Sequence, residues 1–153
     1  MSQMERVQKL YAALGASLGF DDMGKNAQTM YRMNYSDGLS VNVEYMEDAN
    51  RILFAAPMIE LPGVENVDAY VDLLELNLYW DELAGGQFAM LDESKYVLFI
   101  RQIDVETVDE ESFVKDVQAF IDVAGTWYDA LNGKFADEDT GVDESTQNGF
   151  MKV

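Results

Sequence analysis

Carboxylates are the groups in this chain best able to do chemistry, because 29 Asp and Glu stand against 10 Lys and Arg while His and Cys are absent. Without imidazole or thiol there is no His general base, no Cys nucleophile and no zinc site built on those ligands. Paired carboxylates such as Asp21 and Asp22 could do acid–base work. No other polar cluster surrounds them in the sequence, so a solvated turn is the better interpretation. We therefore predict that the protein is not an enzyme.

Two short segments resemble ligand-binding loops but lack residues that such loops require. The acidic run at 137–141 would need Gly at position 6 and Glu at position 12 to form an EF-hand loop, but those positions hold Val142 and Asn148. The pair Gly85-Gly86 lacks the following Lys and Ser or Thr of a phosphate-binding loop, so it predicts a simple connector. We expect no metal and no cofactor.

The net charge of -19 narrows the choice of partners. Phosphate backbones and anionic membranes repel such a chain, so we expect neither nucleic acid nor membrane as a partner. Residues 1–5 do not begin a signal peptide, because no apolar run follows a basic start. No stretch approaches the ~20 apolar residues of a membrane span. These features predict a cytoplasmic protein that binds other proteins.

The chain has 153 residues, which fits one domain. Apolar residues recur with the helical period in three segments and alternate in five others, as in half-buried strands. We predict an α+β fold, α-β-β-β-α-β-β-α, with three helices and an antiparallel five-stranded sheet. The domain spans 1–132, followed by an acidic, disordered tail at 133–153. Helices are expected at about 3–19, 67–83 and 109–131, and strands at about 31–35, 39–45, 51–58, 87–91 and 96–103, with turns at 36–38, 47–50 and 92–95. Gly19 is expected to end the first helix, Asn66 or Asp68 to cap the second, and Asp109 to cap the third.

The middle helix carries two apolar stripes. One comprises Tyr70, Val71, Leu74 and Leu78, and the other comprises Leu73, Leu76 and Trp80. A single stripe suffices to pack a helix on its own sheet. The second stripe therefore indicates another partner, and we predict a homodimer. The alternative is a helix sandwiched inside a monomer.

The ordered set of motifs resembles the class I type III secretion chaperones, the CesT/Tir chaperone family. The resemblance lies in Leu-Leu-Glu-Leu-Asn-Leu at 73–78, in Gly-Gly-Gln-Phe-Ala-Met-Leu-Asp at 85–92 and in the apolar strand at 96–101. It also includes Trp127 near the end of the last helix, and it covers about residues 3–132.

This resemblance implies a homodimer in the bacterial cytoplasm that binds the N-terminal region of a secreted effector in extended form. The bound effector would stay competent for delivery to the secretion apparatus, without bond chemistry. By position, the resemblance implies a dimer interface at Leu73, Leu76, Trp80, Phe88 and Met90. It implies effector-binding patches at Leu14, Leu18, Tyr31, Met33, Val41 and Val43.

A second hypothesis rests on charge alone. An acidic inhibitor or mimic of nucleic acid would bind a basic partner, and its binding would collapse with salt because exposed charges are screened. Binding through apolar pockets would survive salt much better.

Overall fold

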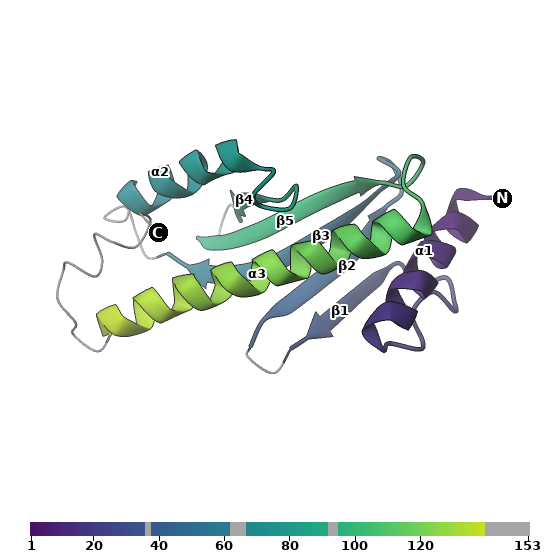
Figure 1. The fold of residues 1–153 in the computed structure, drawn as a ribbon, viewed down its shortest axis with the longest axis horizontal. Coiled ribbons are helices and arrows are strands. Elements are labelled where there is room, and N and C mark those ends of the chain that lie inside the picture. The colour runs from purple at the N-terminus through teal and green to yellow at the C-terminus, as the bar shows by residue number, and fades with distance from the viewer. Residues whose placement is uncertain (36–37, 62–66, 92–94, 140–153) are drawn as a thin grey trace.

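The structure is a computed structural model that describes residues 1–35, 38–61, 67–91 and 95–139, with the backbone alone for 134–139. In these residues three α-helices accompany one five-stranded antiparallel sheet, as predicted (Figure 1). The helices are α1 (Gln3–Leu18), α2 (Val67–Leu76) and α3 (Glu110–Asp139), with a 3-10 turn, η2 (Asn77–Tyr79), after α2. The strands are β1 (Met30–Asn34), β2 (Ser40–Met46), β3 (Arg51–Glu60), β4 (Gln87–Met90) and β5 (Tyr96–Asp104).

The strands lie in the order β1-β2-β3-β5-β4, and every neighbouring pair is antiparallel. The first three strands form the predicted meander. The chain then leaves the sheet to build α2 and β4, and it returns as β5 between β3 and β4. This topology leaves two open edges, at β1 and at β4.

Helix α1 begins and ends close to where the sequence predicts. The Ser2 hydroxyl accepts a hydrogen bond from the Glu5 amide at 3.1 Å, which caps the first turn. Gly19 ends the helix with φ 84°, a left-handed conformation that glycine adopts without a Cβ penalty.

Two predicted boundaries are wrong. Strand β3 continues past Pro57 to Glu60. Proline is tolerated there because the pairing with β2 ends at Ala55 and the register with β5 shifts between Pro57 and Ile59. Helix α2 ends at Leu76, earlier than predicted, because the chain tightens into η2. Asp68 is the second residue of α2 and is not its N-cap.

Helix α3 begins as predicted but ends later. The Asp109 carboxylate accepts a hydrogen bond from the Ser112 amide at 2.7 Å and caps the helix. The helix runs to Asp139, so the predicted tail is wrong for 133–139. One glycine at 133 costs only about 1 kcal/mol against alanine, which a long helix can absorb. Residue 66, the predicted tail from 140 onward and parts of the predicted turns at 36–38 and 92–95 lie outside the described residues.

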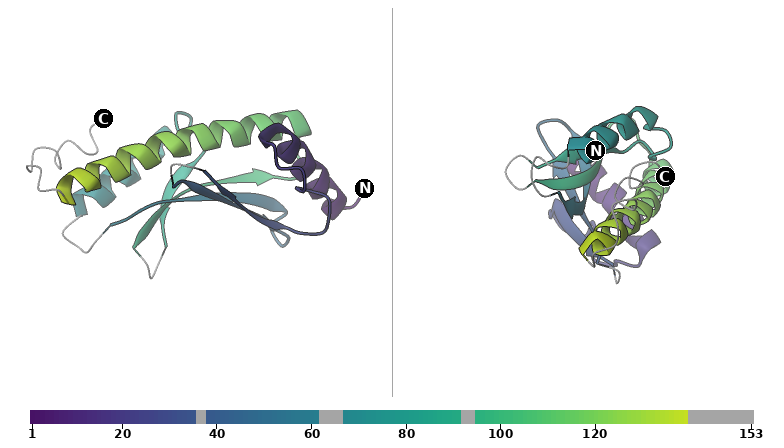
Figure 2. Two further views of the ribbon diagram at one scale, coloured as in Figure 1. Left: turned by 90° about the horizontal axis from the view of Figure 1, so that it is seen from below. Right: turned by 90° about the vertical axis from the view of Figure 1, so that its left-hand side faces the viewer.

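Helices α1 and α3 cover the same face of the sheet, and α2 lies along its β4 end (Figures 1 and 2). An aromatic cluster fills the space under α3. Phe99 of β5 stacks on Phe120 of α3 with ring centroids 5.0 Å apart, and it also contacts Phe88 of β4 at 5.1 Å. Phe54 of β3 meets Phe120 at 6.0 Å, so the cluster joins three strands to α3.

The predicted connector at Gly85-Gly86 has a packing role. Gly85 has a φ of 77°, and a Cβ at Gly86 would lie 2.5 Å from the Phe99 ring. Larger residues would therefore force the turn away from the aromatic cluster. The two glycines allow the chain to pass from α2 into β4 directly against the core.

Candidate protein-binding site

The two stripes of α2 face in unexpected directions. Leu73 is buried against the sheet, and Leu76 is half-buried against the same core. The outward stripe is the one containing Val71, Leu74 and Leu78, of which Leu74 is 69% exposed and Leu78 is 76% exposed. The helix therefore keeps one apolar stripe without a partner in the described part of the protomer, but it is the opposite stripe to the one predicted.

The five residues predicted for the dimer interface differ in how far the fold exposes them. Leu73 and Phe88 belong to the protomer's core and expose little surface, so their place at a dimer interface stays a prediction. Leu76 is half-buried, while Trp80 and Met90 are exposed. Met90 and Leu74 line a small apolar hollow of about 130 Å³ between α2 and β4. Sequence reasoning therefore missed Val71, Leu74 and Leu78 as surface residues.

The predicted effector-binding residues are mostly internal. The side chains buried in the core are Leu14, Met33, Val41 and Val43. Of these, Met33 also reaches the wall of a surface hollow beside β1, as does the half-buried Tyr31. Leu18 and Tyr31 are half-buried at the rim of the core. The strand residues point inward because α1 and α3 cover that face of the sheet. On the opposite face, half-buried apolar side chains project from β3 and β5: Leu53, Ala55, Pro57, Leu98 and Ile100.

Helix α1 and the segment after it position strand β1. The Tyr11 hydroxyl donates to the Thr29 carbonyl at 2.9 Å, and its ring meets Tyr31 edge-on at 5.2 Å. Burial raises the pKa of Tyr11, so its hydroxyl stays protonated as a donor. The Gly24 amide donates to the Tyr31 hydroxyl at 3.1 Å. These contacts hold β1 against the core while its outer edge remains open.

The open edge of β1 presents main-chain hydrogen-bonding groups. The Tyr45 amide donates to the Thr29 carbonyl, and the Tyr35 amide donates to the Leu39 carbonyl. Because bonding alternates along an antiparallel pair, the amide and carbonyl groups of Arg32 and Asn34 face away from β2. No side chain of the described residues caps them, although the Gln28 amide donates to the Met30 carbonyl at 2.6 Å.

A surface hollow of about 440 Å³ lies beside this edge. Its walls come from the segment after α1 and from β1. They combine apolar side chains with Arg32 and with the exposed carboxylates of Asp21 and Asp22. Phe20 is 40% exposed there, and Met30 on the neighbouring edge is 60% exposed. The hollow therefore combines apolar contact, negative charge and an adjacent strand edge. Its lining residues are Gly19, Phe20, Asp21, Asp22, Met23, Tyr31, Arg32 and Met33.

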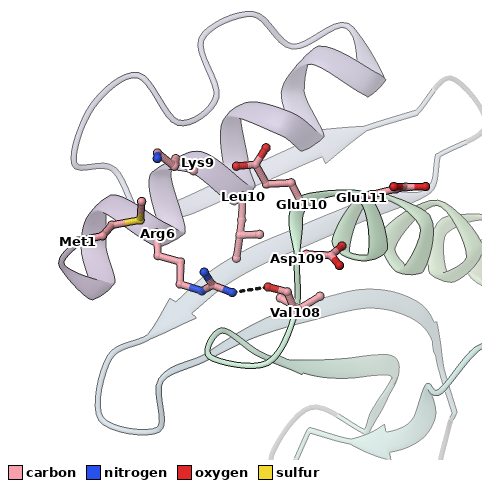
Figure 3. Close-up of a pocket in the computed structure, with 8 residues that line it drawn as sticks. All are labelled: Met1, Arg6, Lys9, Leu10, Val108, Asp109, Glu110 and Glu111. Atoms are coloured by element: carbon pink, nitrogen blue, oxygen red, sulfur yellow. Dashed lines mark hydrogen bonds between the residues drawn. The ribbon is translucent and has the colours of Figure 1, made fainter.

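A second hollow, of about 450 Å³, lies where α1 meets the start of α3 (Figure 3). The Arg6 guanidinium crosses it and donates to the carbonyls of Val105 and Val108 at 2.6 and 2.5 Å. The backbone amide of Ser112 and, to a smaller extent, nearby cations lower the pKa of Asp109. Arg6 is thus committed to joining α1 to the β5–α3 connection, and this hollow is a structural joint.

Replacing Arg6 by methionine is expected to lower the free energy of unfolding by about 2–3 kcal/mol. The variant keeps the aliphatic stem but leaves two carbonyls without their charged donor. Urea unfolding followed by circular dichroism measures the change. Lys9→Met on the exposed side of α1 is the matched control, with an expected change within about 0.5 kcal/mol. Equal unfolding midpoints for the two variants would contradict this role.

The described residues hold no cluster of three or more acidic side chains arranged to bind a metal ion. Among those same residues, no helix is both long enough and apolar enough to cross a membrane.

Solved structures share this arrangement of a twisted sheet under two helices. A chain of the ExsC-ExsE complex has a TM-score of 0.67 at 18% identity, covering 84% of this chain and 95% of that one. A chain of the HopA1-SchA chaperone-effector complex has a TM-score of 0.61 at 12% identity, covering 82% and 97%. A chain of the ExoU-SpcU complex from the type III secretion system of Pseudomonas aeruginosa has a TM-score of 0.56 at 17% identity, covering 74% and 87%.

The chain therefore shares its fold with proteins solved in complexes, of which one is described as a chaperone-effector complex. Residues 9–128 match the model of the Tir chaperone protein (CesT) family, and the chain belongs to this family. The resemblance drawn from the sequence motifs is thereby confirmed, as is the α+β fold. No curated protein sequence matches the chain.

Proposed function

We propose that this chaperone binds the N-terminal region of a secreted effector in extended form and keeps it competent for type III secretion. It acts in the bacterial cytoplasm by binding alone, without bond chemistry. The observation that carries this proposal is an open strand edge beside a hollow of mixed apolar and charged lining in a member of the Tir chaperone family.

The client would add a strand along β1. The outward groups of Arg32 and Asn34 offer main-chain hydrogen bonds to an extended peptide, which give affinity without selecting sequence. The hollow beside β1 would then accept an apolar client side chain against Phe20. Asp21 and Asp22 favour a client with a basic residue nearby, because opposite charges speed encounter and fix register.

The proposal is tested with N-terminal fragments of effectors encoded in the same genome. Each fragment is titrated into the chaperone by calorimetry at low and at high salt, and amide exchange is followed in the complex. We expect one or more fragments to bind at both salt concentrations and to protect the amides of Arg32 and Asn34. Binding that disappears at high salt would instead support an acidic inhibitor. Failure of every fragment to bind would overturn the proposed function.

The β1 edge itself is tested by Arg32→Pro, which removes one outward amide and places a ring in the path of a client strand. Proline is tolerated at such an edge position because its nitrogen faces solvent. We expect client affinity to fall roughly 10- to 100-fold, from the lost bond and the client carbonyl left unpaired. Arg32→Ala, which keeps the amide, is the control and should retain most of the affinity. Equal affinities for the two variants would show that the client does not pair with β1.

We further propose that two copies form a homodimer through the outward stripe of α2. Val71 and Leu74 of α2 and Leu78 of η2 are large apolar side chains exposed at helical spacing. Met90 is exposed and lines the hollow between α2 and β4 together with Leu74, and Trp80 is also exposed. Exposed apolar surface of this kind is typical of a protein interface. A two-fold dimer would let each copy cover the stripe of the other.

A further inference from the structure

Asn77 makes an unusual pair of hydrogen bonds to the edge strand β4. Its Oδ1 accepts from the Phe88 amide at 2.7 Å, and its Nδ2 donates to the Phe88 carbonyl at 3.0 Å. The Leu91 amide donates to the Tyr96 carbonyl. Bonding positions alternate along an antiparallel strand, so Ala89 also bonds to β5 while both main-chain groups of Phe88 face away from it. The carboxamide thus satisfies both groups that another strand would otherwise bind.

The position of Asn77 explains why it reaches this edge. It is the first residue of η2, one turn after Leu73, which is buried in the core. The Gly85 amide donates to the Trp80 carbonyl at 2.8 Å, which turns the chain back toward β4. Within the segment 73–78, one leucine therefore anchors α2 while the asparagine reaches the strand.

The two edges of the sheet differ in this respect. On β1 the outward residues are Met30, Arg32 and Asn34. The Gln28 side chain caps only the Met30 carbonyl, and no side chain of the described residues caps Arg32 or Asn34. On β4 the outward residues are Phe88, which Asn77 caps, and Met90, which no side chain of the described residues caps. A strand of only 4 residues with one outward position blocked offers little for a second strand to pair with.

We propose that Asn77 acts as a substitute strand that closes the β4 edge to strand addition. Client strands are thereby directed to β1, and contacts at the β4 end are made by side chains instead of by extension of the sheet. The statement that clients are directed to β1 rests on the proposed function. The closure of the β4 edge is tested without any client, so this closure and the proposed function can fail separately.

The test compares client-free Asn77→Ala with the wild type by sedimentation and by amide exchange. We expect the Phe88 amide to exchange at least about tenfold faster, because one hydrogen-bonded acceptor is lost. We also expect the mean mass to rise with concentration above that of the wild type, because β4 edges now pair between copies. Asn42→Ala, on the paired strand β2, is the matched control and should change neither quantity.

A second substitution identifies the surface responsible. Met90→Pro removes the remaining outward amide of β4, so adding it to Asn77→Ala should restore the wild-type mass. An Asn77→Ala mass that stays at the wild-type value would overturn the proposal. So would extra association that Met90→Pro does not reverse, because it would then use another surface. Should Asn77→Ala fail to fold, Asn77→Asp replaces it, since the carboxylate still accepts from the Phe88 amide but cannot donate to the carbonyl.

Discussion

Replacing Leu74 by glutamate is expected to turn the proposed dimer into a monomer of 17.2 kDa. Leu74 is 69% exposed in the protomer, so the new carboxylate leaves the fold intact. It raises the free energy only of the dimer, where it would be buried. A two-fold interface buries the substitution twice. An unpaired charge in a dry interface costs several kcal/mol, so even about 4 kcal/mol in total would weaken dimerisation roughly 1000-fold. Sedimentation equilibrium across a range of concentrations measures the change.

Glu75→Gln provides the matched control, because Glu75 is the next residue of α2 and is exposed without belonging to the apolar stripe. Its dimer should be as stable as that of the wild type. Leu76→Glu is less informative, since Leu76 packs partly against the core and its loss would disturb the protomer. A Leu74→Glu protein that sediments as a dimer would show that α2 does not form the interface.

The largest effect on stability is expected from Phe99→Ala. Phe99 is fully buried, and its ring stacks on Phe120 and packs on Phe88. Removing a buried phenylalanine costs about 3–5 kcal/mol, through lost apolar transfer energy and the cavity left behind. Since domains of this size are stabilised by only about 5–15 kcal/mol, the variant should unfold at a much lower urea concentration.

Phe20→Ala is the matched control for stability, because Phe20 is 40% exposed beside the β1 edge. Its unfolding midpoint should stay close to that of the wild type. Client affinity should respond in the opposite way: Phe20→Ala should weaken binding, whereas the folded fraction of Phe99→Ala should bind normally. Similar midpoints for both variants would contradict the central place of Phe99 in the core.

Local patterns determine most of the fold. The 3.6-residue period of α1 and α3 and the alternation of β2 and β5 survive in the structure, because each element buries one face. Capping residues were equally informative at Gly19 and Asp109, where a left-handed turn and a side-chain acceptor mark the helix ends. These signals need only a few neighbouring residues.

The orientation of α2 could not be predicted in the same way. A helical wheel separates two apolar stripes but does not say which one faces the sheet, because Leu73 and Leu74 are chemically equivalent. The choice depends on tertiary contacts: Leu73 fits beside Phe88, and Asn77 must reach the β4 edge. The predicted interface therefore contained two core residues and omitted the exposed stripe.

The candidate client site was hidden for a similar reason. Alternation within β1 and β2 identifies two faces, but α1 and α3 decide which is covered, and they are distant in sequence. Met33 and Val43 therefore proved internal. The open β1 edge also leaves no mark in the sequence, since edge position depends on the order of strands in the whole sheet.

The direct pairing of β3 with β5 determines which part of the protomer can unfold locally. Strands β3 and β5 pair directly up to Glu60↔Tyr96, so α2 and β4 belong to one long connection between two paired strands. The hydrogen bonds between β3 and β5 do not require that connection to be folded. The entropy cost of closing a loop grows slowly with its length, so β3 and β5 can pair before α2 and β4 pack against them. Amides of α2 should therefore exchange by a local opening that spares β3 and β5. Two copies that associate through α2 would suppress this local unfolding. Stronger dimerisation would therefore make the unfolding of the protomer more cooperative.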